Sequence, residues 1–110
     1  MRKIRLMIVD DEPLVRTLIR GSVDWDARGV HVAAEAGSGE EALQLLPMIR
    51  PDILLLDICM YGINGVELAG EAFRLLPDVR VVVISGHDTF AYVQQCLRLG
   101  VTDYLLKPIN

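Results

Sequence analysis

The chain has 110 residues, of which 52 % are hydrophobic and 24 % charged, and its net charge at pH 7 is −4. This length suits one domain, residues 1–110, with a core of its own, and the composition excludes a disordered segment. An acidic domain without a basic stripe is poorly suited to direct contact with nucleic acid. The sequence shows no apolar run long enough to cross a membrane and no signal-peptide pattern, so we expect a cytoplasmic protein.

Short, largely uninterrupted runs of branched aliphatic residues recur along the chain. Such runs are typical of strands that are covered on both faces of a parallel sheet. The runs occupy Ile4–Val9, Val30–Ala34, Ile53–Leu56, Val81–Ile84 and Tyr104–Leu106.

Segments with the apolar spacing of helices lie between these runs. Pro13 suits the first turn of one helix, and the capping box Ser38-Gly39-Glu40-Glu41 predicts the start of the next. A third helix is predicted to begin near Asn64-Gly65 and to end before Pro77, and a fourth to extend from about Asp88 to Leu99.

The alternation of strands and helices predicts the fold class. Gly100 is the expected C-terminal stop of the fourth helix. Because crossover connections are right-handed, the order indicates an α/β protein with a doubly wound, five-stranded parallel sheet and four helices. Ligands bind to such sheets beyond the carboxyl ends of the strands.

Polar side chains follow four of the five predicted strands. If the first strand lies beside the third, in the order 2-1-3-4-5, three aspartates converge on one pocket. The second strand differs, because Glu35-Ala36-Gly37 indicates a turn. The side chains that follow the other strands are Asp10, Asp11 and Glu12, then Asp57, Ser85 and Lys107.

Convergent carboxylates require a compensating cation. Two carboxylates about 4 Å apart repel by roughly 4 kcal/mol at an effective dielectric constant of 20. Hard oxygens suit Mg²⁺, and an ammonium and a hydroxyl beside them would complete a site that stabilises a transferred phosphoryl group. A carboxylate can itself be the nucleophile and form an acyl phosphate. Taken singly, these residues have ordinary alternatives at helix starts and in turns, but together they predict a site.

Five separated stretches match one protein family in order and spacing. They are Ile8–Glu12, Leu54–Met60, Gly65, Ser85 and Asp103–Pro108. On these residues the chain, from about residue 4 to its end, resembles the receiver domain of two-component response regulators. Three stretches are most similar to receivers attached to AraC-type helix-turn-helix DNA-binding domains: Asp24-Trp25, Gly86–Phe90 and Asp103–Ile109.

The resemblance implies a flavodoxin-like fold and a phosphoacceptor. Asp57 would accept a phosphoryl group from a phosphohistidine on a sensor histidine kinase. Asp11 and Asp57 would bind Mg²⁺ by their side chains and Cys59 by its backbone carbonyl, with Asp10 helping directly or through water.

The resemblance also implies a switch. Ser85 and Lys107 would contact the phosphoryl oxygens, and Tyr104 would repack as Ser85 moves. The surface around the fourth helix and fifth strand would then control an output domain, which the AraC-type likeness makes a DNA-binding one.

Three positions depart from the family or need comment. Tyr61 stands where receivers usually have proline, so we expect a loop of different shape without loss of chemistry. Cys59 and His87 occupy positions that tune the phosphoryl lifetime in the family, although His87 also fits a solvated loop residue. Cys59 and Cys96 are interpreted as reduced packing thiols, and a single disulfide between them stays open.

Three other functions share parts of this pattern. A phosphatase of the haloacid dehalogenase type would need a second acid where Cys59 stands, two residues after its nucleophile. A flavodoxin-like electron carrier would need a phosphate-binding loop rich in Ser and Thr, but Asp10-Asp11-Glu12 would repel a phosphate. A degenerate receiver that acts only as a protein-interaction module would not need the full set of Asp, Ser and Lys.

The chain ends at Ile109-Asn110, about one helix earlier than receivers usually do. We therefore expect a receiver cut before its usual fifth helix, with the output domain outside this sequence. Uncovered apolar surface would favour a homodimer, or lower stability than a chain about 15 residues longer.

Overall fold

Strands and helices alternate in the computed structural model, which describes residues 2–57, 65–85, 94, 97–100 and 103–106. The strands are β1 (Ile4–Val9), β2 (Val30–Ala36), β3 (Ile53–Asp57), β4 (Arg80–Ser85) and β5 (Asp103–Leu106). The helices are α1 (Pro13–Ser22), α2 (Gly39–Ile49) and α3 (Gly65–Leu75), with a short 3₁₀ helix at Asp26–Arg28.

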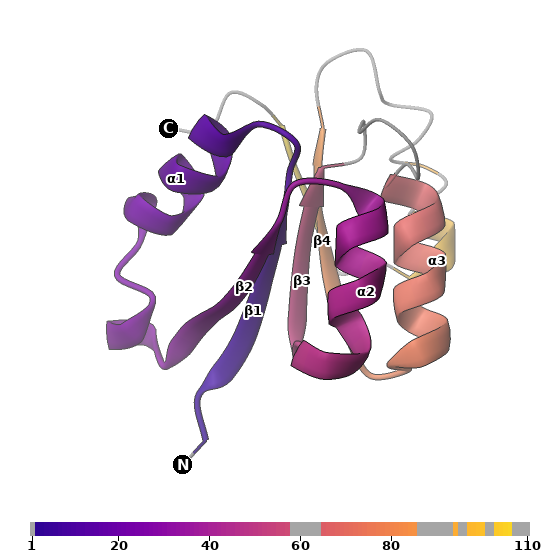
Figure 1. The fold of residues 1–110 in the computed structure, drawn as a ribbon, viewed down its shortest axis with the longest axis horizontal. Coiled ribbons are helices and arrows are strands. Elements are labelled where there is room, and N and C mark those ends of the chain that lie inside the picture. Colours follow the sequence, from indigo (N-terminus) through magenta and orange to yellow (C-terminus); the bar gives the residue numbers. More distant parts are fainter. Residues whose placement is uncertain (1, 58–64, 86–93, 95–96, 101–102, 107–110) are drawn as a thin grey trace.

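The strands form one parallel sheet in the order β2-β1-β3-β4-β5. Figure 1 shows α1 on one face of this sheet and α2 and α3 on the other. The predicted doubly wound, flavodoxin-like α/β fold is therefore confirmed. Most of the predicted fourth helix lies outside the described residues, but residues 97–99 are helical and Gly100 follows them with a φ of 100°. Within the described residues, no helix has the length and apolarity of a membrane span.

Alternate residues of the central strands point to opposite faces of the sheet, as the pleat of a strand requires. Met7 and Val9 of β1 are buried in the core between the sheet and the pair α2 and α3. Leu6 and Ile8 are buried on the other face, together with Ile19 of α1. Strands covered on both faces explain why the sequence shows uninterrupted aliphatic runs.

The start of α2 confirms half of the predicted capping box. The Ser38 hydroxyl accepts a hydrogen bond of 3.1 Å from the Glu41 backbone N–H, which satisfies one of the free donors of the first turn. The Glu41 carboxylate accepts from the Gly37 N–H at 3.3 Å, one residue before the position that a capping box uses. The chain therefore turns tightly between β2 and α2.

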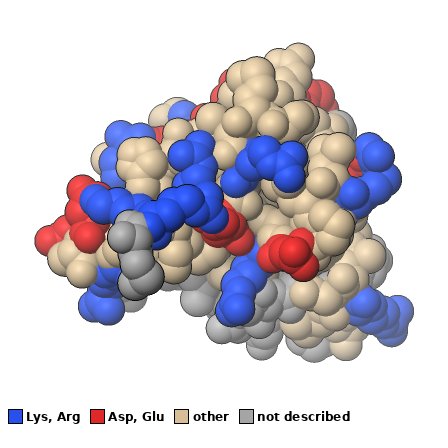
Figure 2. Space-filling view, turned by 90° about the horizontal axis from the view of Figure 1, so that it is seen from below, with Lys and Arg blue, Asp and Glu red and all other residues tan. Residues whose placement is uncertain are grey.

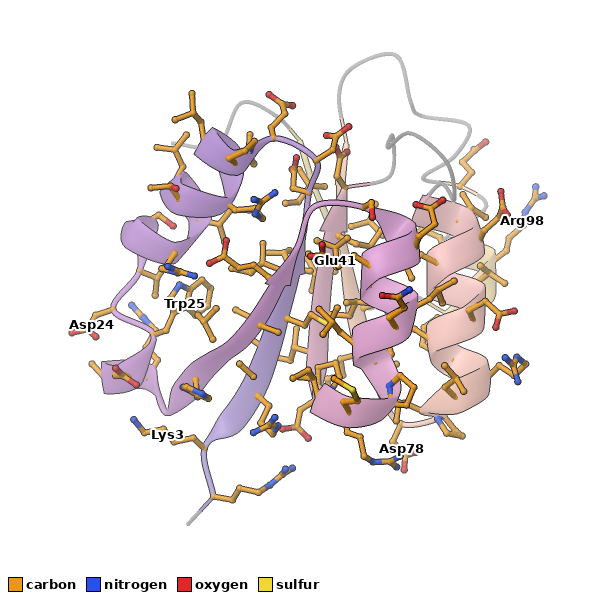
Figure 3. The ribbon with its side chains drawn as sticks, in the orientation of Figure 1. Lys3, Asp24, Trp25, Glu41, Asp78 and Arg98 are labelled. Atoms are coloured by element: carbon orange, nitrogen blue, oxygen red, sulfur yellow. The ribbon has the colours of Figure 1, made fainter. Side chains whose placement is uncertain are left out.

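The connection from α1 to β2 is held by Trp25, whose ring lies between α1 and the sheet (Figure 3). Its indole N–H donates a hydrogen bond of 3.1 Å to the Ile19 carbonyl oxygen. Gly29 then reverses the chain with a φ of 77°, a conformation that glycine adopts without steric cost. These contacts set where β2 begins beside β1.

Candidate functional site

Four carboxylates gather at the carboxyl edge of the sheet. The side chains of Asp10, Asp11, Glu12 and Asp57 each place one oxygen so that all four oxygens lie within 4.8 Å of one another. Asp10 is completely buried and Asp57 is 3 % exposed, whereas Asp11 is half-buried and Glu12 is exposed. The cluster thus has a buried floor and an open rim.

The register of β1 and β3 explains why these acids meet. Val9 and Leu56 are Cα partners in the parallel ladder, so the next residue of each strand stands at the same level. Those next residues are Asp10 and Asp57. The sequence-based prediction that the first and third strands are neighbours, and that their acids converge, is confirmed.

Asp10 also turns the chain into α1. Its backbone N–H donates to the Ala36 carbonyl oxygen at 3.0 Å, which extends the pairing of β1 and β2 by one bond. Its side-chain oxygen then accepts a hydrogen bond of 2.9 Å from the Glu12 N–H, in the manner of an Asx turn. The turn directs Asp11 and Glu12 over the sheet edge immediately before Pro13 starts the helix.

An arginine holds this turn in place. The Arg16 guanidinium in α1 donates to the Asp10 main-chain carbonyl oxygen and, at 3.2 Å, to the Glu35 carboxylate. Arg20, one helical turn later, forms an ion pair with the same carboxylate. Arg16 and Glu35 are largely buried, with 19 % and 22 % of their side chains exposed. The clamp of Arg16, Arg20 and Glu35 joins α1, β1 and β2 beside the acid cluster.

The end predicted for the second strand requires a correction. Glu35-Ala36 was predicted to be part of a turn, but both residues belong to β2. The strand continues because the Glu35 charge is neutralised by two guanidinium groups, so a charged residue is tolerated in the half-buried end of a strand. The clamp was missed at the sequence level. Its signal was the i,i+4 pair Arg16 and Arg20 on the face that approaches the second strand.

The acid cluster has the composition of a site for a hard divalent cation. Carboxylate oxygens are the preferred ligands of Mg²⁺ and Ca²⁺, and an open rim leaves room for the waters that Mg²⁺ retains. Like charges this close are unfavourable without a counter-ion. The residues present therefore fit a bound metal ion, with the four clustered carboxylates as candidate ligands.

Two other predicted site residues lie on strands next to β3. Ile84 of β4 is the Cα partner of Asp57, so Ser85, the last residue of β4, stands one position further toward the same edge. Tyr104 belongs to β5 and pairs with Val83. For both residues the structure describes the backbone and not the side chain.

The remaining predicted residues lie outside the described part of the chain. They are Cys59, Tyr61, His87, Cys96 and Lys107. The roles predicted for them therefore stay predictions.

Comparison with known proteins decides the family. The model of the response regulator receiver domain matches residues 6–110. The chain belongs to this family. Receiver domains are phosphoacceptor signalling modules and not enzymes, which displaces the phosphatase and electron-carrier interpretations.

Relatives of this receiver domain include transcriptional regulators. It is 36 % identical to the transcriptional regulatory protein DegU of Brevibacillus brevis over 108 residues, which is 98 % of this chain and 45 % of DegU. The receiver domain of AraT, a response regulator from Geobacillus stearothermophilus, has a TM-score of 0.94 and 43 % identity, covering 100 % of this chain and 84 % of that one. The two-component transcriptional regulator AraC from Clostridium phytofermentans has a TM-score of 0.86 and 30 % identity, covering 98 % of this chain and 84 % of that one. The receiver domain spans less than half of DegU.

Proposed function

We propose that Asp57 is the phosphoacceptor of this receiver domain. In the proposed step, a carboxylate oxygen of Asp57 forms a bond to phosphorus while the phosphorus–nitrogen bond of a kinase phosphohistidine breaks, which leaves a neutral histidine once a proton is taken up. The observation that carries the proposal is the placement of a nearly buried Asp57 carboxylate among the other acids at the carboxyl edge of the sheet. Phosphoryl transfer depends mainly on such positioning and on charge stabilisation.

Mg²⁺ is the metal we propose for the acid cluster. When bound there, it would neutralise the carboxylates and the negative charge of the transferred group. Asp10, Asp11 and Asp57 would hold it with their side chains and Cys59 with its backbone carbonyl. The turn at Asp10 supports the proposal, because hydrogen bonds within the chain set its conformation without a metal.

The response to phosphorylation would travel through β4 and β5. A phosphoryl group adds nearly two negative charges and three acceptor oxygens at Asp57. We propose that Ser85 and Lys107 bind those oxygens and that Tyr104 repacks as Ser85 moves. Support comes from the register, in which Asp57, Ser85 and Tyr104 belong to three neighbouring strands. The surface around the predicted fourth helix and β5 would then shift between two pre-existing states.

The partners of the full protein follow from the same proposal. A sensor histidine kinase would supply the phosphoryl group, and a DNA-binding output domain would receive the signal, in a cytoplasmic protein. The transcriptional regulators among the relatives support such an output. A methylesterase of Treponema pallidum is also 36 % identical over 109 residues, so receivers this similar belong to proteins of other kinds. A receiver that only binds other proteins remains the alternative for this chain.

Phosphorylation by a small donor separates the two proposals. The protein is incubated with acetyl phosphate and Mg²⁺ and its intact mass is measured. We expect the mass of one added phosphoryl group, absent without Mg²⁺ and absent in Asp57→Asn. Asp52→Asn is the matched control, because Asp52 directly precedes β3 at the opposite edge of the sheet and its removal should leave phosphorylation normal. An unmodified wild type under these conditions would favour the binding-only receiver.

A further inference from the structure

A hollow lies at the amino-terminal ends of the strands, at the edge of the sheet opposite the acid cluster. It has a volume of about 750 Å³ and lies where the start of β1, the end of α2 and the segment between α3 and β4 come together. A smaller hollow of about 490 Å³ adjoins it along the starts of β3 and β4 and shares four lining residues with it. We refer to the two together as the basic groove, and Figure 2 views the molecule from this end.

The basic groove is positively charged in an acidic chain. Five cationic side chains and two carboxylates line it, whereas the whole chain has a net charge of −4. Figure 2 shows the blue side chains spread across this end with the carboxylates between them. The cations are Arg2, Lys3, Arg5, Arg50 and Arg80, and the carboxylates are Asp52 and Asp78.

Some of these cations have structural roles. Arg2 forms an ion pair of 2.7 Å with Asp52, and Lys3 forms one with Asp26. The Arg5 side chain donates to the Ile49 carbonyl oxygen at 3.0 Å and so satisfies an acceptor at the C-terminus of α2. These contacts fix the walls of the groove. They do not involve the other two arginines of the groove, Arg50 and Arg80.

Arg50 and Arg80 are the surplus charges. Both are exposed, and neither side chain has a hydrogen bond or an ion pair with any residue in the described part of the chain. Arg5 already supplies a cation at the end of α2, so a second one at Arg50 adds little to the helix.

The backbone conformation at Arg50 is unfavourable for a residue that has a side chain. Its φ is 48°, in the left-handed region, where its N–H bonds to the Leu46 carbonyl oxygen at 2.9 Å and ends the helix. Glycine is the usual residue at such a position, because a Cβ atom there is sterically unfavourable. A strained residue of this kind, with its charge directed to solvent, indicates a use outside the fold.

One wall of the basic groove is apolar. Met48 lies beside Arg50 on the last turn of α2 and is 72 % exposed, while Leu76 and Val79 form a buried floor. Pro51 and Pro77 complete the lining between them. An exposed methionine next to cations matches a ligand that carries apolar groups as well as negative charge.

We propose that the basic groove docks an acidic, partly apolar segment of another protein. Carboxylates of the segment would pair with Arg50 and Arg80, and its apolar side chains would pack on Met48. The two carboxylates of the groove, Asp52 and Asp78, disfavour a continuous phosphate chain, whereas a peptide can space its acids around them. Docking here would leave the acid cluster accessible, because the length of the six-residue strand β1 separates the two, about 20 Å.

A model peptide tests the docking. The probe is a short peptide that alternates glutamate with leucine, titrated into the protein at low salt while backbone amide shifts are recorded. We expect shifts confined to the amino-terminal edge, around Arg2, Met48 and Arg50, and an affinity that falls as salt is added. The same peptide with lysine in place of glutamate should not bind.

Arg50→Gly separates docking from a structural role. Because glycine adopts the left-handed conformation freely, we expect this variant to melt at the same or a higher temperature while the peptide binds about fivefold more weakly. Met48→Ser should weaken binding with the fold intact. Arg98→Gln, an exposed arginine away from this edge in Figure 3, should bind the peptide as wild type does.

Three outcomes would overturn the proposal. The first is equal affinity of wild type and Arg50→Gly for the peptide. The second is tighter binding of a single-stranded oligonucleotide than of the peptide at this edge, which would make the groove a phosphate-binding surface. The third is self-association of the wild type that Arg50→Gly abolishes, which would make a second copy of the chain the occupant.

Discussion

The Arg16 guanidinium in α1 donates a hydrogen bond to the main-chain carbonyl oxygen of Asp10. Asp10 directly follows β1 and belongs to the acid cluster. The same guanidinium contacts the Glu35 carboxylate, so one side chain connects a helix and two strands at the edge where the site lies. Hydrogen bonds within the fold therefore hold the turn that carries Asp10. Substitution of Arg16 therefore tests whether the clamp stabilises the fold.

Replacing Arg16 by alanine should destabilise the protein and weaken metal binding together. The change removes the guanidinium donor of the Asp10 carbonyl oxygen and one of the two arginine partners of Glu35, which costs about 1–3 kcal/mol in the free energy of unfolding. Arg16→Lys keeps the charge but loses the two-armed geometry, so we expect only partial recovery. Urea denaturation with and without Mg²⁺ measures both effects.

Arg74→Ala is the matched control for that experiment. Arg74 pairs with Glu71 on the surface of α3, where 67 % of its side chain is exposed, and such pairs contribute little. Equal stability of the Arg16 and Arg74 variants would show that the clamp has no role in the fold.

Neutralising one acid of the cluster should raise stability without metal and abolish the stabilisation by metal. In Asp10→Asn, one charge leaves a group of four carboxylates, so the metal-free protein should gain on the order of 1 kcal/mol. The melting temperature of wild type should rise on addition of Mg²⁺, whereas that of Asp10→Asn should change little. Differential scanning calorimetry at several Mg²⁺ concentrations provides the measurement. Asp78→Asn, an exposed acid at the other edge, should keep the wild-type response to Mg²⁺.

The sequence predicted the strands and the convergence of the acids because both follow from short-range patterns. Aliphatic runs such as Ile4–Val9 identify strands covered on both faces, and the order of elements then brings Asp10 and Asp57 to one edge. The buried faces of the helices were harder to predict. In α1, Leu14 and Leu18 have the i,i+4 spacing of one helix face but are 79 % and 56 % exposed, whereas Ile19 is buried.

Long-range contacts between charged residues could not be predicted. The pairing of Glu35 with Arg16 and Arg20 depends on how α1 lies across the end of β2, which no local pattern specifies. The basic groove joins residues 2–5, 48–52 and 76–80 from separate elements, so no single stretch of the sequence shows its full charge. The expected truncation before a last helix stays a prediction.

Asp52 should contribute stability that depends on pH. The Arg5 backbone N–H bonds to its carboxylate at 2.8 Å, and this bond, helped by Arg2, lowers the pKa of Asp52 in the folded state although partial burial opposes the shift. A carboxyl whose pKa is lowered by folding adds stability above its unfolded pKa of about 3.9, and that stability is lost as the pH falls through the folded pKa.

Comparison of wild type with Asp52→Asn isolates this contribution. Wild type should be the more stable protein near pH 6, and the difference in the free energy of unfolding should shrink as the pH falls from about 5 to about 2.5. Chemical denaturation at a series of pH values gives the two curves. A difference that stays constant over this range would contradict the assignment of the lowered pKa to Asp52.

Chemical trapping of the phosphorylated residue tests the central claim most directly. Borohydride reduces an aspartyl phosphate to homoserine, so the modified position can be read from the peptides of protein treated first with acetyl phosphate and Mg²⁺. The account predicts homoserine at position 57 and none at positions 10, 11 or 52. Homoserine at Asp10 or Asp11, with Asp57 unmodified, would contradict it.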